Sequence, residues 1–209
     1  MLSAVAYYDM ELQQMDVKTA FLHGNLDEFI VMEQPEGFVD KQIPDKVCRL
    51  KRSLYGLKQS PRQWNKRFDD FVRAQGYIRS EYDSCVYFKQ NEKGVYIYML
   101  LYVDDILIAS VDKSQVQKLK AELSSEFDMK DLGDAKKILG MEITRNRDKR
   151  ELSVSQEDYL WKVLGKFNMD QSKLVTTPLG AHFKLKTPTD KEYQEQEERM
   201  KNIPYQSAV

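Results

Sequence analysis

The sequence predicts an α+β fold, in which helices pack against one face of an antiparallel sheet. Two observations support this prediction. Amphipathic helical patterns and short runs rich in Tyr, Val, Ile and Phe follow one another in the order helix, strand, helix, strands, helix, strands. The 209 residues are 42% hydrophobic and 11% aromatic, which is enough to build a buried core.

The first part of the chain contains a helix end, a strand and a loop. Residues 1–9 resemble the last turns of a helix that begins without a cap, so we expect a missing upstream segment. Residues 11–17 alternate in the manner of a strand that carries Asp16 near its end. Residues 34–45 contain two prolines and a glycine and are predicted to form an extended loop.

A helix is predicted from Ser60 to Gly76. Ser60 is the expected N-cap, Pro61 suits the first helical position, and Gly76 can end the helix. One face is apolar, with residues at helical spacing: Trp64, Phe68, Phe71 and Val72. The basic side chains point largely away from that face: Arg62, Lys66, Arg67 and Arg73.

The second half of the chain is predicted to contain strands at residues 83–90 and 95–111. An amphipathic helix follows at residues 113–127, and residues 137–144 and 151–154 form the expected strands of a hairpin. Ser155 and Asp158 resemble a capping box for another amphipathic helix. After Thr176 the chain becomes polar and then strongly charged, so its order there is left open.

Overall charge and cysteine content exclude several classes of site. The net charge is −1, but residues 45–79 hold ten Lys or Arg against three Asp, which suits either a polyanion or a solvated surface. Cys48 and Cys85 lie far apart, so neither a zinc site nor a disulfide framework is expected.

The longest apolar run is interrupted by Asp104 and Asp105, and no membrane span or signal peptide is predicted. We therefore expect an intracellular protein.

The acidic pair Asp104–Asp105 is the strongest chemical signal in the sequence. It lies within a strongly apolar run of strand-forming residues, where two adjacent carboxylates are costly unless a tight turn places them at an accessible edge. Oxygen ligands without nearby His or Cys favour Mg²⁺ or Mn²⁺. The alternative is a simple exposed acidic turn.

Two-metal phosphoryl or nucleotidyl transfer generally needs a further carboxylate from elsewhere in the chain. Asp16 is the best candidate because it ends a predicted strand. The pattern alone leaves three competitors open: Asp9, Asp27 and Asp83.

Four ordered blocks resemble copia-type retrotransposon reverse transcriptases. They are MDVKTAFLHG (residues 15–24), SLYGLKQSPRQW (53–64), LLYVDDILIAS (100–110) and LGMEI (139–143). The resemblance runs almost from end to end. It implies the right-hand palm fold of polymerases, with incomplete fingers, because the basic segment that contacts the triphosphate in the family would lie upstream of residue 1.

The resemblance also implies a role for each matching residue. Asp16, Asp104 and Asp105 would be catalytic and would hold two Mg²⁺ ions, replaceable by Mn²⁺, with the backbone carbonyl of Val17. Phe21 would be the aromatic gate that excludes a ribose 2′-hydroxyl. The other nucleotide-binding residues would be Tyr55, Gly56 and Lys58. The template and primer would be contacted by Ser60, Pro61, Arg62, Lys66, Tyr102, Leu139 and Gly140.

The family pattern further implies a domain plan and partners. Residues 1–145 would form the palm with partial fingers, residues 146–178 a thumb-like or connection region, and residues 179–209 a polar and poorly ordered tail. The expected activity is RNA-directed DNA polymerisation, with an RNA template, a DNA primer, deoxynucleoside triphosphates and other parts of a retroelement polyprotein as partners. Its expected location is the cytoplasm, inside a virus-like particle for an active element, or the nucleus.

Two other readings remain open from the sequence. A catalytically inactive fragment could persist as a nucleic-acid-binding or interaction module. An unrelated metal-dependent phosphohydrolase could use the same acidic pair, although the four ordered blocks disfavour it.

Overall fold

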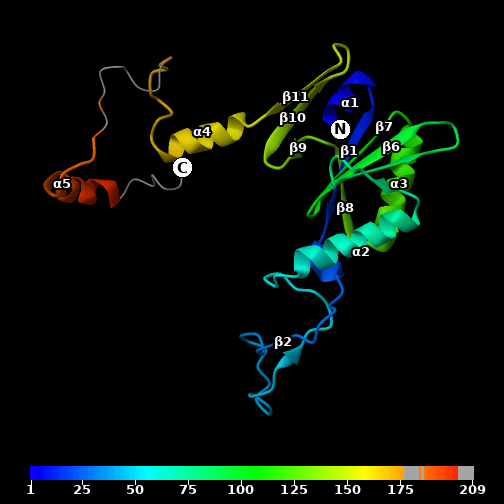
Figure 1. Ribbon diagram of the computed structural model, residues 1–209, viewed down its shortest axis with the longest axis horizontal. Helices are drawn as coiled ribbons and strands as arrows, with labels where there is room; N and C mark the ends of the chain where they lie inside the picture. The colour runs from blue at the N-terminus through cyan, green and yellow to red at the C-terminus, as the bar shows by residue number, and fades with distance from the viewer. Residues whose placement is uncertain (177–183, 185, 202–209) are drawn as a thin grey trace. The chain divides into compact units, whose positions relative to one another are not determined.

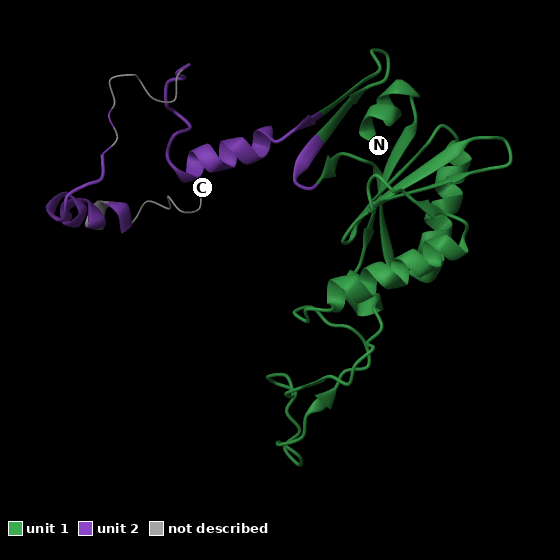
Figure 2. Ribbon diagram, viewed as in Figure 1, with its two compact units in different colours: residues 1–138, 143–153 green, residues 139–142, 154–209 purple. Residues whose placement is uncertain are grey.

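The computed structural model describes residues 1–176, 184 and 186–201 (Figure 1). The chain divides into two compact units (Figure 2). Unit 1 contains Met1–Ile138 and Ile143–Ser153, and unit 2 contains Leu139–Glu142 and Val154–Val209. Within the described ranges, no helix combines the length and the apolar character needed to cross a bilayer.

Unit 1 is built on a six-stranded sheet in the order β4-β5-β6-β7-β1-β8. Every neighbouring pair in this sheet is antiparallel, which confirms the predicted mixture of helices and an antiparallel sheet. The strands are β1 (Glu11–Val17), β4 (Ile78–Arg79), β5 (Val86–Gln90), β6 (Tyr96–Tyr102), β7 (Asp105–Ser110) and β8 (Met129–Asp134). The position of β1 between β7 and β8 brings the start of the chain beside residues about one hundred positions later.

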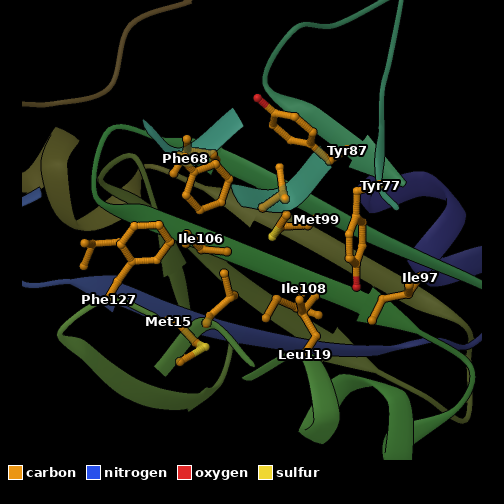
Figure 3. Close-up of a cluster of buried hydrophobic side chains, with 14 of the residues drawn as sticks. Met15, Phe68, Tyr77, Tyr87, Ile97, Met99, Ile106, Ile108, Leu119 and Phe127 are labelled. Carbon is orange, nitrogen blue, oxygen red and sulfur yellow. The ribbon is translucent and has the colours of Figure 1, made fainter. Parts of the chain in front are cut away.

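Helices α2 (Ser60–Ala74) and α3 (Lys113–Glu126) contribute side chains to the core on one face of this sheet. Figure 3 shows the aromatic and aliphatic side chains that fill it. The apolar face predicted for α2 is confirmed, because Trp64, Phe68 and Val72 are at most 2% exposed. The strands contribute alternate residues to this face: Met15, Met99, Ile106 and Ile108. The residues between these positions in β1 and β7 therefore point to the other face of the sheet.

Two details at helix starts differ from the prediction. Gln59 rather than Ser60 is the N-cap of α2, and no side chain caps that helix. The Ser60 hydroxyl instead donates to the Leu54 carbonyl and accepts from Ser53. The capping box at Ser155 is also absent: α4 (Glu157–Lys166) has no side-chain cap at Gln156, and Ser155 Oγ accepts the N–H of Glu157 instead.

Strand β8 was not predicted. Its sequence, MKDLGD, is polar and contains a glycine, and its side chains are mostly exposed at the edge of the sheet. A strand of this kind is defined by its pairing with β1 rather than by hydrophobic alternation, so the sequence carries no signal for it.

Unit 1 also contains four short elements. They are α1 (Leu2–Tyr7), the 3₁₀ helix η1 (Ala20–His23), and strands β2 (Val31–Met32) and β3 (Cys48–Arg49), which pair with each other. A second sheet joins β9 (Lys137–Ile138), β10 (Met141–Asn146) and β11 (Glu151–Ser155) in the order β11-β10-β9. Unit 2 contains α4, which has no buried residue, and α5 (Asp190–Lys201). Helix α5 falls in the predicted polar tail, whereas residues 177–183, 185 and 202–209 of that region lie outside the described residues.

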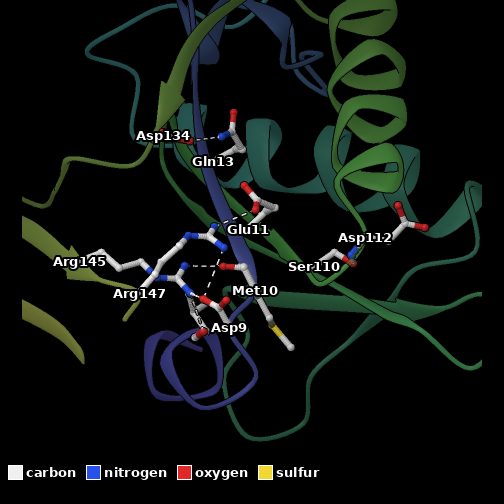
Figure 4. Close-up of polar contacts among 10 residues, drawn as sticks. Asp9, Met10, Glu11, Gln13, Ser110, Asp112, Asp134, Arg145 and Arg147 are labelled. Carbon is white, nitrogen blue, oxygen red and sulfur yellow. Dashed lines mark hydrogen bonds and ion pairs between the residues drawn. The ribbon is translucent and has the colours of Figure 1, made fainter. Parts of the chain in front are cut away.

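Polar contacts attach the end of α1 and the start of β1 to two arginines, one in β10 and one directly after it (Figure 4). Arg145 donates to the backbone carbonyls of Val5 and Met10 and to the carboxylate of Asp9, and its side chain is only 16% exposed. Arg147 pairs with Asp9 at 3.4 Å and with Glu11 at 2.7 Å. Asp9 is therefore engaged by two guanidinium groups.

Candidate active site

The acidic pair lies at the hairpin between β6 and β7. Tyr102 and Asp105 are paired across the hairpin, so Val103 and Asp104 form a two-residue turn. Val103 has a φ of 57°, a left-handed conformation that is unfavourable for a β-branched residue. Such a conformation costs on the order of 1–3 kcal/mol and persists only when its surroundings enforce it.

Two hydrogen bonds from outside the hairpin hold this turn. The indole N–H of Trp64, in α2, donates to the Val103 carbonyl at 2.6 Å. The backbone N–H of Val17, at the end of β1, donates to the Asp104 carbonyl at 2.8 Å. The turn that carries Asp104 is thus attached to both α2 and β1.

Asp16 lies directly opposite Asp105 in the pairing of β1 with β7. Directly opposed residues point to the same face of a sheet, with Cβ atoms about 4.5–5.5 Å apart. Gln14 lies two residues before Asp16 and therefore on the same face, where its amide donates to Asp105 Oδ1 at 3.0 Å. Gln14 itself is only 6% exposed.

Three influences act on the carboxyl group of Asp105. Burial, the largest, raises its pKa; the hydrogen bond from Gln14 opposes this, and the charges of Asp104 and Asp16 raise the pKa further. The net direction is upward. Carboxylates that share a site repel one another in this way, and a bound cation relieves the repulsion.

The donor set fits a hard divalent cation in its chemistry. Carboxylate oxygens without His or Cys are the ligands that Mg²⁺ and Mn²⁺ prefer. Among residues 1–176, 184 and 186–201, no group of three His, Cys, Asp or Glu is arranged so that it could hold an ion. The support for the site is the register of Asp16 with Asp105 and the effect of the charges of Asp104 and Asp16 on the pKa of Asp105.

The three competing aspartates have other partners. Asp9 is bound by Arg145 and Arg147, and Asp27 accepts a hydrogen bond from Gln63 at 2.7 Å. Asp83 accepts the N–H of Cys85 in the loop before β5. Only Asp16, of the four candidates, lies opposite the acidic pair.

Two predicted nucleotide-binding residues meet although they are far apart in sequence. The rings of Phe21, in η1, and Tyr55 lie with centroids 4.6 Å apart. Phe21 is half-buried, whereas Tyr55 is 51% exposed. Gly24 allows η1 to approach α2 closely, since a Cβ at this position would lie 3.0 Å from Gln63 Cβ. The other two predicted residues, Gly56 and Lys58, are exposed in the same loop as Tyr55.

The predicted template and primer residues differ in accessibility. Pro61, Arg62, Lys66 and Tyr102 are exposed, but Ser60 is buried and its hydroxyl is engaged within the loop. Leu139 and Gly140 are exposed and form a two-residue turn between β9 and β10, with φ values of 51° and 75°; they belong to unit 2.

The basic side chains of α2 fall into two groups. Arg67 pairs with Glu126, and Arg73 pairs with Asp69 at 2.7 Å. Within the described part of the chain, Arg62 and Lys66 form no ion pair. Their charges are thus available to an external anion.

The structure adds two residues that the sequence did not identify as functional: Gln14 and Trp64. The spacing of two residues between Gln14 and Asp16 was a usable signal for Gln14, because residues two apart share a strand face. No pattern in the sequence connects Trp64 with Val103, which is 39 residues away.

Comparison with known proteins identifies the class. The family described as "Reverse transcriptase (RNA-dependent DNA polymerase)" matches residues 1–181. The chain belongs to this family and, by its relatives, to the copia-type reverse transcriptases of retrotransposons.

Its relatives are retrotransposon proteins. The chain is 51% identical over 208 residues to the retrovirus-related Pol polyprotein from transposon TNT 1-94 of Nicotiana tabacum, covering 100% of this chain and 16% of the relative. It is 38% identical over 174 residues to the Pol polyprotein from transposon RE1 of Arabidopsis thaliana, covering 83% of this chain and 12% of the relative. It is also 38% identical to a putative transposon Ty5-1 protein of Saccharomyces cerevisiae, over 79% of this chain and 53% of that protein. The chain thus spans less than two thirds of each of these relatives.

Proposed function

We propose that this chain is the polymerase core of a copia-type retrotransposon polyprotein and extends a DNA primer on an RNA or DNA template. One observation carries the proposal: Asp16 lies directly opposite Asp105, beside the turn that carries Asp104. Carboxylates from β1 and from the β6–β7 hairpin thus lie together, and they supply the oxygen ligands that a two-metal nucleotidyl-transfer site uses.

In this proposal Asp16, Asp104 and Asp105, with the carbonyl of Val17, hold two Mg²⁺ ions, for which Mn²⁺ can substitute. When bound, the ions make the primer 3′-hydroxyl more acidic and offset charge on the triphosphate and the leaving pyrophosphate. The protein's own contribution is to hold the carboxylates in place, and Gln14 supports this by its hydrogen bond to Asp105.

The residues around Phe21 form the proposed nucleotide pocket. The Phe21 ring, packed against Tyr55, would leave neither room nor a hydrogen-bond partner for a ribose 2′-hydroxyl. Gly56 and Lys58 lie in the same loop, where Lys58 can approach a triphosphate.

The template and primer are proposed to lie along exposed basic and loop residues. Arg62 and Lys66 would contact phosphates of the template backbone. Ser60 would act indirectly, because its buried hydroxyl fixes the loop that precedes α2. The other proposed contacts are Pro61, Tyr102, Leu139 and Gly140.

The proposed organisation places the palm and partial fingers in residues 1–145, a thumb-like or connection region in residues 146–178, and a polar tail in residues 179–209. Further parts of the polyprotein would be its partners. The proposed location is the cytoplasm, in a virus-like particle, or the nucleus.

A primer-extension assay with poly(rA)/oligo(dT), Mg²⁺ and dTTP tests the proposal on the full 209-residue chain. Extension should be abolished by Asp104→Asn and retained by the matched control Asp70→Asn, an exposed aspartate on α2. In the same assay, Phe21→Val should increase the use of UTP relative to dTTP. Equal extension by Asp104→Asn and the wild-type chain would refute the assignment of the carboxylates.

The second candidate function is nucleic-acid binding without catalysis. It is favoured by the exposed Arg62 and Lys66, which form no ion pair among the residues that the structure describes. Salt-sensitive binding of the template–primer without extension, in the presence of either Mg²⁺ or Mn²⁺, would support this function instead.

A further inference from the structure

The turn that carries Asp104 is held in an unfavourable conformation by groups outside its own hairpin. Val103 has a φ of 57°, and no glycine is present in the turn to adopt this conformation without strain. Left to itself, the turn would populate other conformations and carry the Asp104 carboxylate with it.

Trp64 is suited to act as a rigid anchor for this turn. Its side chain is 2% exposed and lies against the rings of Phe68 and Phe127, with centroids 5.6 and 5.2 Å away. The indole N–H then reaches the carbonyl of Val103 at 2.6 Å. Phenylalanine could fill most of the same space, but it has no donor for this carbonyl.

We propose that Trp64 is a positioning residue, whose indole N–H holds the Val103–Asp104 turn so that the Asp104 carboxylate stays beside Asp16 and Asp105 for binding a divalent cation. This inference rests on the proposed function of the three carboxylates. It assigns to a buried residue of α2 a task that ring packing alone would not require.

The chain offers a matched control, because it contains two tryptophans. Trp161, in unit 2, is 54% exposed and its indole N–H faces Glu157 at 3.5 Å. Trp64→Phe and Trp161→Phe therefore remove the same group from two different environments. Trp161→Phe also leaves Trp64 as the single indole, so its N–H gives one assignable NMR signal.

The first measurement is Mn²⁺ binding, read from the electron paramagnetic resonance signal of the free ion. Trp64→Phe should weaken binding by about tenfold, since an ordinary hydrogen bond contributes roughly this factor. Trp161→Phe should leave binding unchanged. Circular dichroism and thermal unfolding report whether each variant is folded, so a loss of affinity is not mistaken for a loss of structure.

The second measurement needs no change at Trp64. If the hydrogen bond favours the cation-binding conformation, the cation must favour the hydrogen bond by the same factor, because coupling between two equilibria is reciprocal. In the Trp161→Phe protein, saturating Mg²⁺ should therefore slow solvent exchange of the Trp64 indole proton by about tenfold, the same factor as the loss in affinity.

Each outcome gives a decision. Weaker Mn²⁺ binding by folded Trp64→Phe together with slower indole exchange in Mg²⁺ supports the inference. Unchanged Mn²⁺ binding by folded Trp64→Phe overturns it. If Trp64→Phe fails to fold, an indole exchange rate that is the same with and without bound Mg²⁺ overturns it. Failure of the wild-type chain to bind either ion would instead refute the proposed function on which the inference rests.

Discussion

Two adjacent glutamines of β1 allow a matched test of how the carboxylates are held. Gln13 and Gln14 are both buried, at 7% and 6% exposure, but they point to opposite faces of the sheet. Gln14 donates to Asp105. Gln13 accepts from Lys120 at 3.0 Å and donates to Asp134, a contact visible in Figure 4. The variants Gln14→Leu and Gln13→Leu remove equivalent amides with opposite consequences.

Gln13→Leu should cause the larger loss of stability. The side chain of Lys120 is 6% exposed, so loss of the Gln13 carbonyl leaves a buried ammonium with Asp131 as its remaining partner. We expect a loss of about 3 kcal/mol in the free energy of unfolding. Gln14→Leu removes one bond from a carboxylate that water can also reach, so we expect a loss of about 1 kcal/mol.

The stabilisation by Mg²⁺ should distinguish the two variants in the opposite order, with the larger loss in Gln14→Leu. If the proposed site binds Mg²⁺, a concentration one hundred times its Kd would stabilise the wild-type chain by about 2.7 kcal/mol. A tenfold loss of affinity in Gln14→Leu would leave about 1.4 kcal/mol. Gln13→Leu should retain the full stabilisation, since its contacts lie on the helix-covered face.

Urea unfolding of the three proteins, with and without Mg²⁺, measures both quantities. The reasoning is refuted if Gln14→Leu gains as much stability from Mg²⁺ as the wild-type chain does. It is also refuted if Gln13→Leu is the variant that loses this gain.

Two further predictions follow from charge and burial. In fluorescence-anisotropy titrations of template–primer binding, the double variant Arg62→Ala/Lys66→Ala should reduce the magnitude of the slope of log K against log salt by about 1 to 2. The control Arg67→Ala removes a cation that is already paired within the chain, so it should leave the slope unchanged. Burial raises the pKa of the Tyr77 and Tyr87 phenols in the folded chain above the value near 10 of the unfolded chain. The stability that this difference contributes is complete below about pH 10 and is lost as the pH rises further. Above about pH 10 the free energy of unfolding should therefore fall by at most about 1.4 kcal/mol per pH unit for each of the two residues. Urea titrations at several alkaline pH values should show a slope that is smaller by up to about 1.4 kcal/mol per pH unit for Tyr87→Phe than for the wild-type chain, and an unchanged slope would contradict the assignment.

The elements with local signals were predictable from the amino-acid sequence. Hydrophobic spacing predicted α2 and its buried face, and the apolar runs on both sides of Asp104–Asp105 predicted the hairpin of β6 and β7. The ordered motifs identified the family, which the matching family model and the retrotransposon relatives confirm. These features depend on periodicity and on residue order, and both are present in the linear chain.

The groups that meet at the candidate site from distant parts of the chain became visible in the folded structure. The sequence left Asp16 in competition with three other aspartates, and the register of β1 with β7 placed it opposite Asp105. The contacts made by Gln14 and Trp64 depend on the same register and on the packing of α2 against the sheet. Register and packing are set by burial over the whole core, in which residues about one hundred positions apart become neighbours. For this reason the acidic pair could be identified from the sequence, whereas the groups that hold it in place could not.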